Sequence, residues 1–352
     1  MSRFISKRFE TLEAYTPGEQ PQNRKYIKLN TNESPFPPSP EVIKVINENE
    51  TSSLMLYPDP TTTSLLKTIA EKYGISENEV IVGNGSDEIL AFSFFAFSDK
   101  NPGVCFSDIT YGFYEVYADL YGFEKEIIPL GENFEVVPES FCNKNKTIFI
   151  ANPNAPTGKY LPLSDIEKIL ASNREYVVVI DEAYVDFGGE SAVSLIHKYD
   201  NLLVVQTFSK SRSLAGARLG MAIGNKELIA DLNKIKYSFN PYSINRLTLL
   251  AGEAAMKDTE YFESCRSKII KNREITSEEL EKMGFLVLPS KTNFLFARHK
   301  NISGAKLYEK LKEEGILVRH FKKDRISDFV RITIGNEEQM NIFIKTVRRI
   351  IG

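Results

Sequence analysis

The chain has 352 residues, of which 42% are hydrophobic and 26% are charged, and it carries a net charge of −3. This composition is typical of a globular protein with a large core, and the length favours about two domains. So small a negative charge gives no electrostatic reason to expect nucleic acid or an acidic membrane surface as a partner.

No segment indicates export or a membrane span. Residues 1–8 lack the apolar core of a signal peptide, and no run approaches the roughly 18 apolar residues that cross a bilayer. Cys105, Cys142 and Cys265 are odd in number and far apart, which fits neither a disulfide framework nor a zinc site. We therefore expect a cytoplasmic protein with no metal, no membrane contact and no nucleic acid.

Residues 1–30 are expected to form an N-terminal arm. The run Tyr15–Pro21 is rich in turn-forming residues, and its prolines exclude regular helix. A short strand is expected at Ile27–Asn30. Four prolines then exclude regular structure in Thr31–Pro40, whose polar start around Asn32 fits either a plain linker or a loop that faces a substrate.

From residue 40 onward, helical patterns alternate with short apolar runs. Such alternation predicts right-handed crossovers and a mainly parallel sheet, which is an α/β fold. We expect helices at Pro40–Asn49, Ser64–Tyr73 and Ser164–Ser172, and strands at Val80–Val82, Val104–Phe106, Thr147–Ala151, Tyr176–Ile180 and Leu202–Gln206.

Three successive strands of this sheet end in polar residues. Asn154 follows the first, Asp181 and Tyr184 follow the second, and Ser209 and Lys210 follow the third. Ligands of open α/β sheets bind at the carboxyl ends of the strands, which lie at one edge. This convergence predicts an active site there.

Lys210 is the centre of that expected site, because its amine can form a Schiff base with a carbonyl. Ser209 and Arg218 supply the hydroxyl and guanidinium that suit a phosphate. Gly85-Ser86-Asp87 opens a helix after a strand, which favours an anion site. The alternative for this turn is a plain strand-to-helix connection capped by Ser86. It is not a dinucleotide fingerprint, because Glu88 replaces the third glycine.

The last third of the chain indicates a second, smaller α+β domain. Residues 226–282 have a helical pattern that Pro241 and Gly252 punctuate. Arg319 and Arg331 lie in apolar strands, where each either meets an anion or faces solvent from an edge strand. We expect strands at Phe285–Pro289, Asn293–Ala297, Ile316–Arg319 and Phe329–Ile334, helices at Gly304–Glu314 and Glu337–Ile351, and domains at 31–245 and 246–352.

Pyridoxal 5′-phosphate (PLP) fits the whole set of residues. Its aldehyde suits Lys210, and its phosphate suits the anion-binding groups around that lysine. A carboxylate such as Asp181 can keep the pyridine nitrogen protonated, so that the ring withdraws electrons. Asn154 and Tyr184 can hydrogen-bond the ring hydroxyl oxygen, and Tyr111 can stack on the ring.

Three motifs resemble fold-type I PLP-dependent aminotransferases of the class I/II group: Asn-Pro-Asn-Ala-Pro-Thr-Gly at 152–158, Asp-Glu-Ala-Tyr at 181–184, and Ser-Lys with an arginine eight residues later. Further motifs are similar to the histidinol-phosphate aminotransferase family: Tyr15–Gly18, Leu29–Glu33, Tyr57–Pro58 and Leu214–Gly220. The likeness runs from Tyr15 to the C-terminus. Ala155 departs from the family, which usually has asparagine there.

The resemblance implies a large PLP-binding domain with a mainly parallel central sheet, a smaller C-terminal domain and an N-terminal arm. It implies that Lys210 binds the cofactor and moves the proton. It also implies a homodimer with shared active sites, in which Tyr57 reaches the neighbouring subunit. The substrate's anionic end would be held by Tyr15, Asn32, Arg319 and Arg331.

The reaction implied is transamination of L-histidinol phosphate with 2-oxoglutarate, which yields imidazole acetol phosphate and glutamate in histidine biosynthesis. A threonine-phosphate decarboxylase-like enzyme would use the same Lys210 and Asp181 to break another bond. An aromatic amino-acid aminotransferase would offer Arg331 a carboxylate instead. A cofactor-binding regulator without turnover would need a DNA-binding appendage, and no strongly basic or helix-turn-helix-like domain precedes residue 30. A domain without chemistry would not explain the convergence of polar residues.

Overall fold

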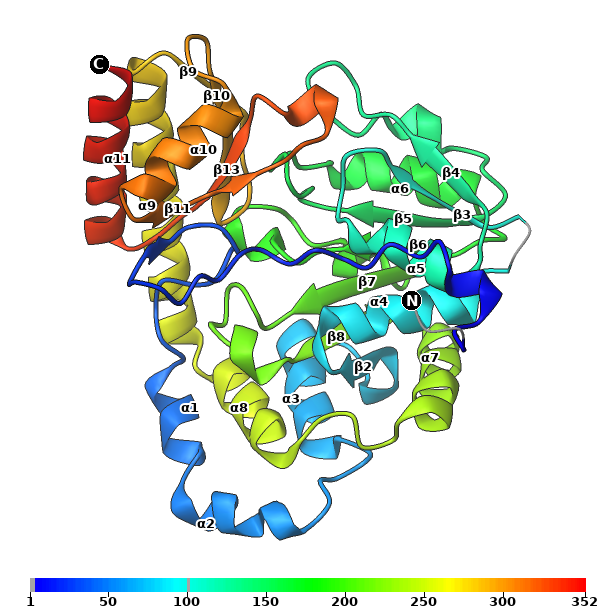
Figure 1. Ribbon diagram of the computed structural model, residues 1–352. Helices are drawn as coiled ribbons and strands as arrows, with labels where there is room; N and C mark the ends of the chain where they lie inside the picture. The colour runs from blue at the N-terminus through cyan, green and yellow to red at the C-terminus, as the bar shows by residue number, and fades with distance from the viewer. Residues whose placement is uncertain (1–3, 100–101) are drawn as a thin grey trace.

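The computed structural model describes residues 4–99 and 102–352, so the first three residues of the expected arm lie outside it. Its centre is a seven-stranded sheet (Figure 1). The sheet confirms the predicted α/β fold, because β7, β6, β5, β3 and β4 run parallel while β8 is antiparallel to both neighbours. In spatial order the strands are β2 (Val80–Gly83), β8 (Gly220–Gly224), β7 (Leu202–Thr207), β6 (Val178–Asp181), β5 (Thr147–Ala151), β3 (Val104–Ser107) and β4 (Lys125–Ile128).

Helices cover both faces of this sheet, so its central strands are apolar on both sides. All six residues of β7 are buried, with Leu202 and Val204 in one core cluster and Leu203 and Val205 in another. A strand that is buried on both faces has a continuous run of apolar residues, so β7 could be predicted from the sequence. The covering helices are α3 (Thr63–Tyr73), α4 (Gly85–Phe97), α5 (Phe113–Tyr121), α6 (Leu163–Ser172), α7 (Lys226–Phe239) and α8 (Arg246–Lys257).

A second, antiparallel sheet lies beyond the first, in the order β12, β13, β10, β9. Its strands are β12 (Arg319–His320), β13 (Val330–Thr333), β10 (Phe294–His299) and β9 (Phe285–Val287). The helices beside it are α9 (Thr259–Lys282), α10 (Gly304–Glu313) and α11 (Glu337–Ile351). The domain limits at residues 30 and 245 stay a prediction.

The N-terminal segment contributes one strand to a third sheet, which has two strands. It crosses the front of the molecule in Figure 1 and ends in β1 (Ile27–Lys28), which pairs in parallel with β11 (Ile316–Leu317). Among the described residues no helix is both long and apolar enough to span a membrane.

Two helical expectations were wrong. The helix expected at Pro40–Asn49 is divided into α1 (Pro40–Val45) and α2 (Glu48–Ser52), because the Asn47 side chain accepts a hydrogen bond from the Glu50 amide and starts a new helix. Gly252 does not interrupt a helix. It lies inside α8, where an added Cβ would stand 2.3 Å from the Leu219 side chain, so glycine permits close packing.

Gly220 determines how closely β8 approaches the turn before α4. It pairs with Gly83 on one side and with Thr207 on the other. A Cβ at position 220 would stand 2.3 Å from the Ser86 amide nitrogen and 2.5 Å from the Gly85 carbonyl carbon. Both are backbone atoms that cannot rotate away, so only glycine fits.

Substitution Gly220→Ala should therefore destabilise the protein by about 1–3 kcal/mol, the usual cost of an overpacked site. The free energy of unfolding in urea measures it. Gly216→Ala is the control, because a Cβ there meets nothing within 4 Å and should change stability by less than about 0.5 kcal/mol. Equal stability of the two variants would contradict the role of Gly220.

Candidate active site

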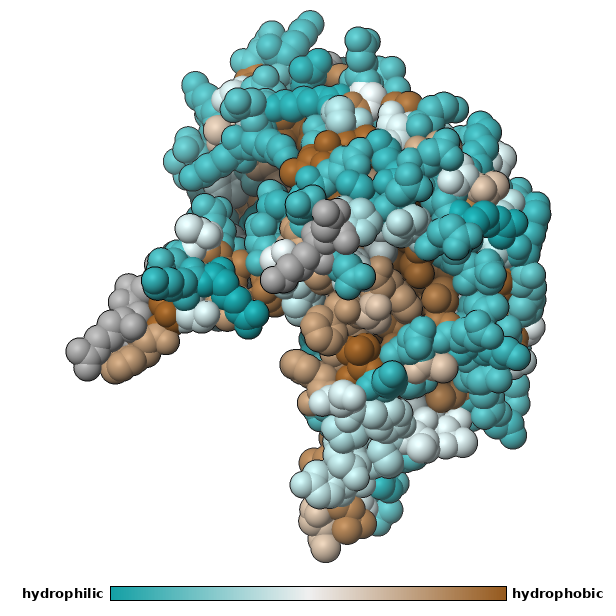
Figure 2. Space-filling model, turned by 90° about the vertical axis from the view of Figure 1, so that its right-hand side faces the viewer, coloured by the Kyte–Doolittle hydropathy of each residue, from teal (hydrophilic) through white to brown (hydrophobic). Residues whose placement is uncertain are grey.

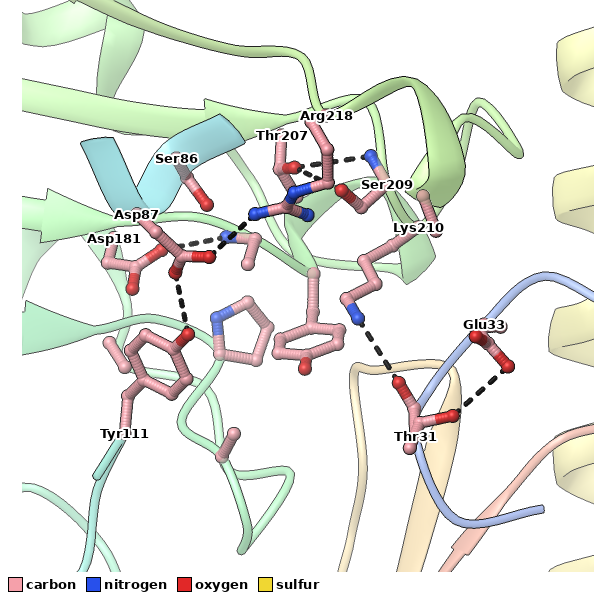
Figure 3. Close-up of a pocket in the computed structure, with 16 residues that line it drawn as sticks. Thr31, Glu33, Ser86, Asp87, Tyr111, Asp181, Thr207, Ser209, Lys210 and Arg218 are labelled. Atoms are coloured by element: carbon pink, nitrogen blue, oxygen red, sulfur yellow. Dashed lines mark hydrogen bonds and ion pairs between the residues drawn. The ribbon is translucent and has the colours of Figure 1, made fainter. Parts of the chain in front are cut away.

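A cavity of about 260 Å³ opens where the carboxyl ends of β5, β6 and β7 meet the first turn of α4. Figure 3 shows side chains from α4, β6, β7 and the loop after β7 around one space. The cavity brings together most of the residues predicted for the cofactor. It is lined by Thr31, Glu33, Ser86, Asp87, Tyr111, Ala151, Pro153, Ala155, Asp181, Ala183, Tyr184, Thr207, Ser209, Lys210, Ala215 and Arg218.

Lys210 extends into the cavity from the loop after β7. Its Nζ donates a hydrogen bond to the Thr31 carbonyl oxygen at 3.3 Å (Figure 3). Burial, followed by the positive charge of Arg331, lowers the pKa of Lys210 to about 8. A substantial fraction of the amine is therefore unprotonated near neutral pH, which is the form that can attack a carbonyl.

One corner of the cavity is suited to a phosphate. Arg218 Nη2 forms an ion pair with Asp87 Oδ2 at 2.7 Å, and Asp87 Oδ1 accepts from the Tyr111 hydroxyl at 2.6 Å. Gly85 allows the arginine to lie against the backbone, since an added Cβ would stand 2.6 Å from its Nη2. The α4 N-terminus faces the same corner, and its amides and dipole favour an anion.

The first turn of α4 departs from one alternative raised by the sequence. Its N-cap is Asn84 rather than Ser86, and the Asn84 side chain makes no capping hydrogen bond. The Ser86 side chain instead lines the cavity beside Arg218. Ser209 lies opposite, and its hydroxyl is 3.0 Å from the Thr207 hydroxyl, which donates to it. This uncapped turn, with two hydroxyls and a guanidinium nearby, fits the phosphate of PLP.

Asp181 ends β6 on the floor of the cavity and is only 5% exposed. Its Oδ2 accepts a hydrogen bond from the Tyr114 hydroxyl at 2.8 Å, and its Oδ1 accepts from the Ala183 amide at 3.3 Å. Burial raises the pKa of Asp181 to about 6, an effect that the Tyr114 hydrogen bond opposes. The carboxylate is thus mostly ionised at neutral pH and fits a protonated ring nitrogen.

Asn154 and Tyr184 are held by their own hydrogen bonds. The Asn154 amide donates to the Ile109 carbonyl and to Thr157 Oγ1, each at 3.0 Å, and accepts from the Thr110 hydroxyl. Tyr184 lines the cavity, and its ring centroid is 5.9 Å from Lys210 Nζ. Tyr184 therefore lines the cavity as predicted, whereas Asn154 is not among its lining residues and its amide is already paired with protein groups.

A second cavity of about 560 Å³ adjoins the first and shares Thr31, Tyr111, Ala155, Tyr184 and Lys210 with it. It brings together the four residues predicted to hold the substrate: Tyr15, Asn32, Arg319 and Arg331.

Arg331 is the cation best placed for an anion in this second cavity. Its Nη2 donates to the Asn30 carbonyl at 3.0 Å, and its buried Nε has no hydrogen-bond partner among the described residues. The guanidinium of Arg319 is instead used by the arm, because it donates to the Thr16 and Pro17 carbonyl oxygens at 3.2 and 3.3 Å. Tyr15 of the same arm stacks on Phe113, with ring centroids 4.2 Å apart.

Tyr57 is not brought into either cavity of its own chain. It is 79% exposed and stacks on Tyr242 with ring centroids 4.7 Å apart. Sequence reasoning also missed two residues of the site, Tyr114 and Thr207. A weak signal existed for each, since Tyr114 stands three residues after Tyr111 and Thr207 ends the strand before Lys210.

Comparisons with known proteins agree with this geometry. A family model described as aminotransferase class I and II matches residues 24–347. A curated protein named histidinol-phosphate aminotransferase, from Clostridium acetobutylicum, is 54% identical over 352 residues, which are 100% of both chains. One of the same name from Brachyspira hyodysenteriae is 53% identical over 100% of this chain and 99% of its own. The solved histidinol-phosphate aminotransferase from Sinorhizobium meliloti, in complex with pyridoxal-5′-phosphate, has the same fold, with a TM-score of 0.90, 21% identity, and coverage of 100% of this chain and 98% of that one.

The lowered pKa of Lys210 predicts how fast its amine reacts at each pH. Only the unprotonated amine attacks an aldehyde, so labelling by pyridoxal in the cofactor-free protein should increase through about pH 8 and then level off. Mass spectrometry after borohydride reduction measures the rate. Lys44 is an internal control, because the Glu41 carboxylate raises its pKa above 10.5. Labelling of Lys210 that still increases at the pH where Lys44 titrates would contradict the lowered pKa.

Proposed function

This chain belongs to the aminotransferase class I and II family, and from this premise we propose that it transfers the amino group of L-histidinol phosphate to 2-oxoglutarate. The products are imidazole acetol phosphate and glutamate, and the reaction belongs to histidine biosynthesis. The observation that carries the proposal is the joined pair of cavities, with a nucleophilic amine in one and a buried arginine with a free Nε in the other. An amino alcohol phosphate carries its amine and its anion at opposite ends.

PLP is the cofactor, and when bound it withdraws electrons from the substrate's Cα and makes the hydrogen there acidic. The chain's own residues hold it and move the proton. Arg218, Ser209 and the first turn of α4 bind the phosphate, while Asp181 keeps a proton on the ring nitrogen. Lys210, whose pKa is about 8, would act as the base that takes the Cα proton and as the acid that gives it back.

Arg331 is assigned the anionic end of the substrate. Its buried Nε lacks a partner among the described residues, so a phosphate there would gain a charged hydrogen bond. Tyr15 and Arg319 line the same cavity, and Arg319 holds the arm that carries Tyr15 by donating to the Thr16 and Pro17 carbonyl oxygens. The decarboxylase and aromatic aminotransferase alternatives share this fold, but relatives that are 54% and 53% identical along the whole chain favour histidinol phosphate.

Cytoplasmic location is part of the proposal. Cys105, Cys142 and Cys265 are all free thiols, and two of them are buried. Free thiols persist in reducing compartments. Recovery of the native protein only from an oxidising compartment after cell fractionation would contradict this location.

A homodimer with shared sites is the remaining part of the proposal. The segment around α2 protrudes at the bottom of Figures 1 and 2 and carries exposed apolar side chains, among them Met55 at 87% and Tyr57 at 79% exposure. Figure 2 also shows hydrophobic side chains on the face that carries α7, where an apolar hollow lies beside Phe95 and Phe239. Apolar surface of this kind marks an interface, here with a second copy of the chain.

The visible absorption of the purified protein with PLP tests the reaction. Addition of L-histidinol phosphate should remove the band of the bound cofactor's aldehyde form, and 2-oxoglutarate should restore it. The Lys210→Ala variant should fold and bind PLP through its phosphate but lose turnover by at least about 10⁴-fold, since it lacks both nucleophile and base.

Two controls make this test specific. Arg331→Gln should raise KM for histidinol phosphate by roughly tenfold or more while leaving PLP affinity nearly unchanged, because it removes a charged hydrogen bond to the substrate alone. A band that ignores histidinol phosphate but responds to threonine phosphate or an aromatic amino acid would overturn the substrate. Retained turnover in Lys210→Ala would overturn the mechanism.

Mixing two impaired variants tests the shared site. Lys210→Ala subunits retain Tyr57, and Tyr57→Ala subunits retain Lys210, so a mixed dimer contains one site with both residues. Unfolding and refolding the two together should restore up to about a quarter of wild-type activity, by random pairing. Activity that is no greater than the sum of the separate variants would contradict the sharing of Tyr57, and a sedimentation mass of one chain would contradict the dimer.

A further inference from the structure

Asn32, which the sequence analysis assigned to the substrate, has its side chain committed elsewhere. It is only 1% exposed. Its Nδ2 donates a hydrogen bond to the Tyr184 hydroxyl oxygen at 2.9 Å, and its Oδ1 accepts from the Thr333 hydroxyl at 3.0 Å. Thr333 lies on β13 of the second sheet, whereas Tyr184 follows β6 of the first. Asn32 therefore connects the two sheets through one amide.

Thr333 determines which way round this amide lies. The Thr333 Oγ1 accepts the backbone N–H of Asn32 at 3.0 Å, which leaves its own hydrogen to donate to Asn32 Oδ1. Turning the amide over would point two donors at the same hydroxyl oxygen and deprive its hydrogen of this acceptor. Thr333 is only 2% exposed, and buried polar groups in proteins are nearly always paired. The amide nitrogen therefore faces Tyr184.

The orientation of the Asn32 amide in turn determines whether the Tyr184 hydroxyl has a hydrogen left to donate. A phenol has one hydrogen to donate, and its oxygen can also accept. Because the oxygen of Tyr184 already accepts from Asn32, its hydrogen is left for an acceptor elsewhere. Burial raises the pKa of Tyr184, so the hydroxyl keeps this hydrogen at neutral pH. Tyr184 lines the cavity assigned to the cofactor.

We propose that Asn32 and Thr333 are positioning residues, which orient the Tyr184 hydroxyl so that it donates its hydrogen to the ring hydroxyl oxygen of bound PLP. This inference rests on the proposed function, because it takes PLP as the occupant of the cavity. It adds a route by which the second sheet acts on the cofactor. The backbone conformation of Asn32, with φ of 56°, fits this role, since asparagine tolerates the left-handed region.

The Asn32→Asp variant tests the proposal. Aspartate has nearly the same shape and also tolerates a positive φ, but an ionised carboxylate only accepts hydrogen bonds. It would draw the Tyr184 hydrogen toward itself and away from the cofactor. The measurement is the Kd of the cofactor-free protein for PLP and for 3-deoxypyridoxal 5′-phosphate, an analogue that lacks the ring hydroxyl.

The ratio of the two affinities is the readout. Asn32→Asp should weaken PLP by roughly tenfold to a hundredfold, the value of one hydrogen bond to a charged oxygen, and should weaken the analogue by only about threefold or less. The new negative charge repels both phosphates equally, so this repulsion cancels in the ratio. In a Tyr184→Phe background, which has no hydroxyl to orient, Asn32→Asp should change the ratio far less, and any change that remains measures the direct repulsion of the ring oxygen.

Thr333 supplies a matched pair of variants. Thr333→Val removes the hydroxyl at nearly constant volume and should weaken PLP selectively, because the Asn32 amide is no longer held. Thr333→Ser keeps the hydroxyl and should retain the wild-type ratio. Circular dichroism confirms that each variant folds, and if the Asn32 variant does not fold, the Thr333 pair decides the question.

The outcomes that overturn the inference differ from those that overturn the proposed function. Equal losses of affinity for PLP and for the analogue would mean that Asn32 has only a structural role. An unchanged affinity for both would mean that Asn32 has no role at the site. Both outcomes assume a wild-type protein that binds PLP and transaminates histidinol phosphate. A wild-type protein that binds neither PLP nor the analogue would instead overturn the proposed function.

Discussion

The site depends on the position of β8 between β2 and β7. This strand runs against both neighbours, so that Gly220 pairs with Gly83 on one side and with Thr207 on the other. The pairing places the first turn of α4 beside the loop that carries Lys210, although more than a hundred residues separate them in sequence. The groups proposed to bind the cofactor's phosphate come together at this contact between two glycines and a threonine.

Charge is the second constraint, because Lys210 and Arg331 are cations whose surroundings are largely shielded from water and which line the same cavity. Arg218 is paired with Asp87, whereas burial lowers the pKa of both Lys210 and Arg331, and the charge of Arg331 lowers the pKa of Lys210 further. Separate like charges in a buried site cost free energy unless an anion or a neutral amine relieves them. The charge of Lys210 is reduced because the amine is partly unprotonated. The charge of Arg331 stays, and the proposed function pairs it with the substrate's anion. Reactivity and specificity thus have the same electrostatic origin.

Many helices and strands of the fold could be predicted from the sequence, because local patterns of apolar and polar residues determine them. The strand at Thr147–Ala151 and the helix at Glu337–Ile351 have the predicted bounds, since one is a continuous apolar run and the other has a clear helical period. β8 was missed because its two glycines make Gly220–Gly224 resemble a loop. Tyr114 was missed because its importance comes from Asp181, 67 residues away, and a contact of that kind leaves no local pattern.

The same limit explains why Asn32 was assigned to the substrate. The residues next to Asn32 in sequence correctly indicate a polar loop that faces a cavity. They cannot show which groups form hydrogen bonds with its side-chain amide. The three consecutive residues Asn30–Asn32 contact Arg331, Lys210 and Tyr184 in turn, by way of two carbonyl oxygens and one side chain. One short segment therefore contacts the amine of Lys210, the phenol of Tyr184 and Arg331, which is proposed to bind the substrate's anion. The segment is held on both sides of these contacts, because β1 pairs with β11 and because Thr333 of β13 hydrogen-bonds to Leu29 and Asn32.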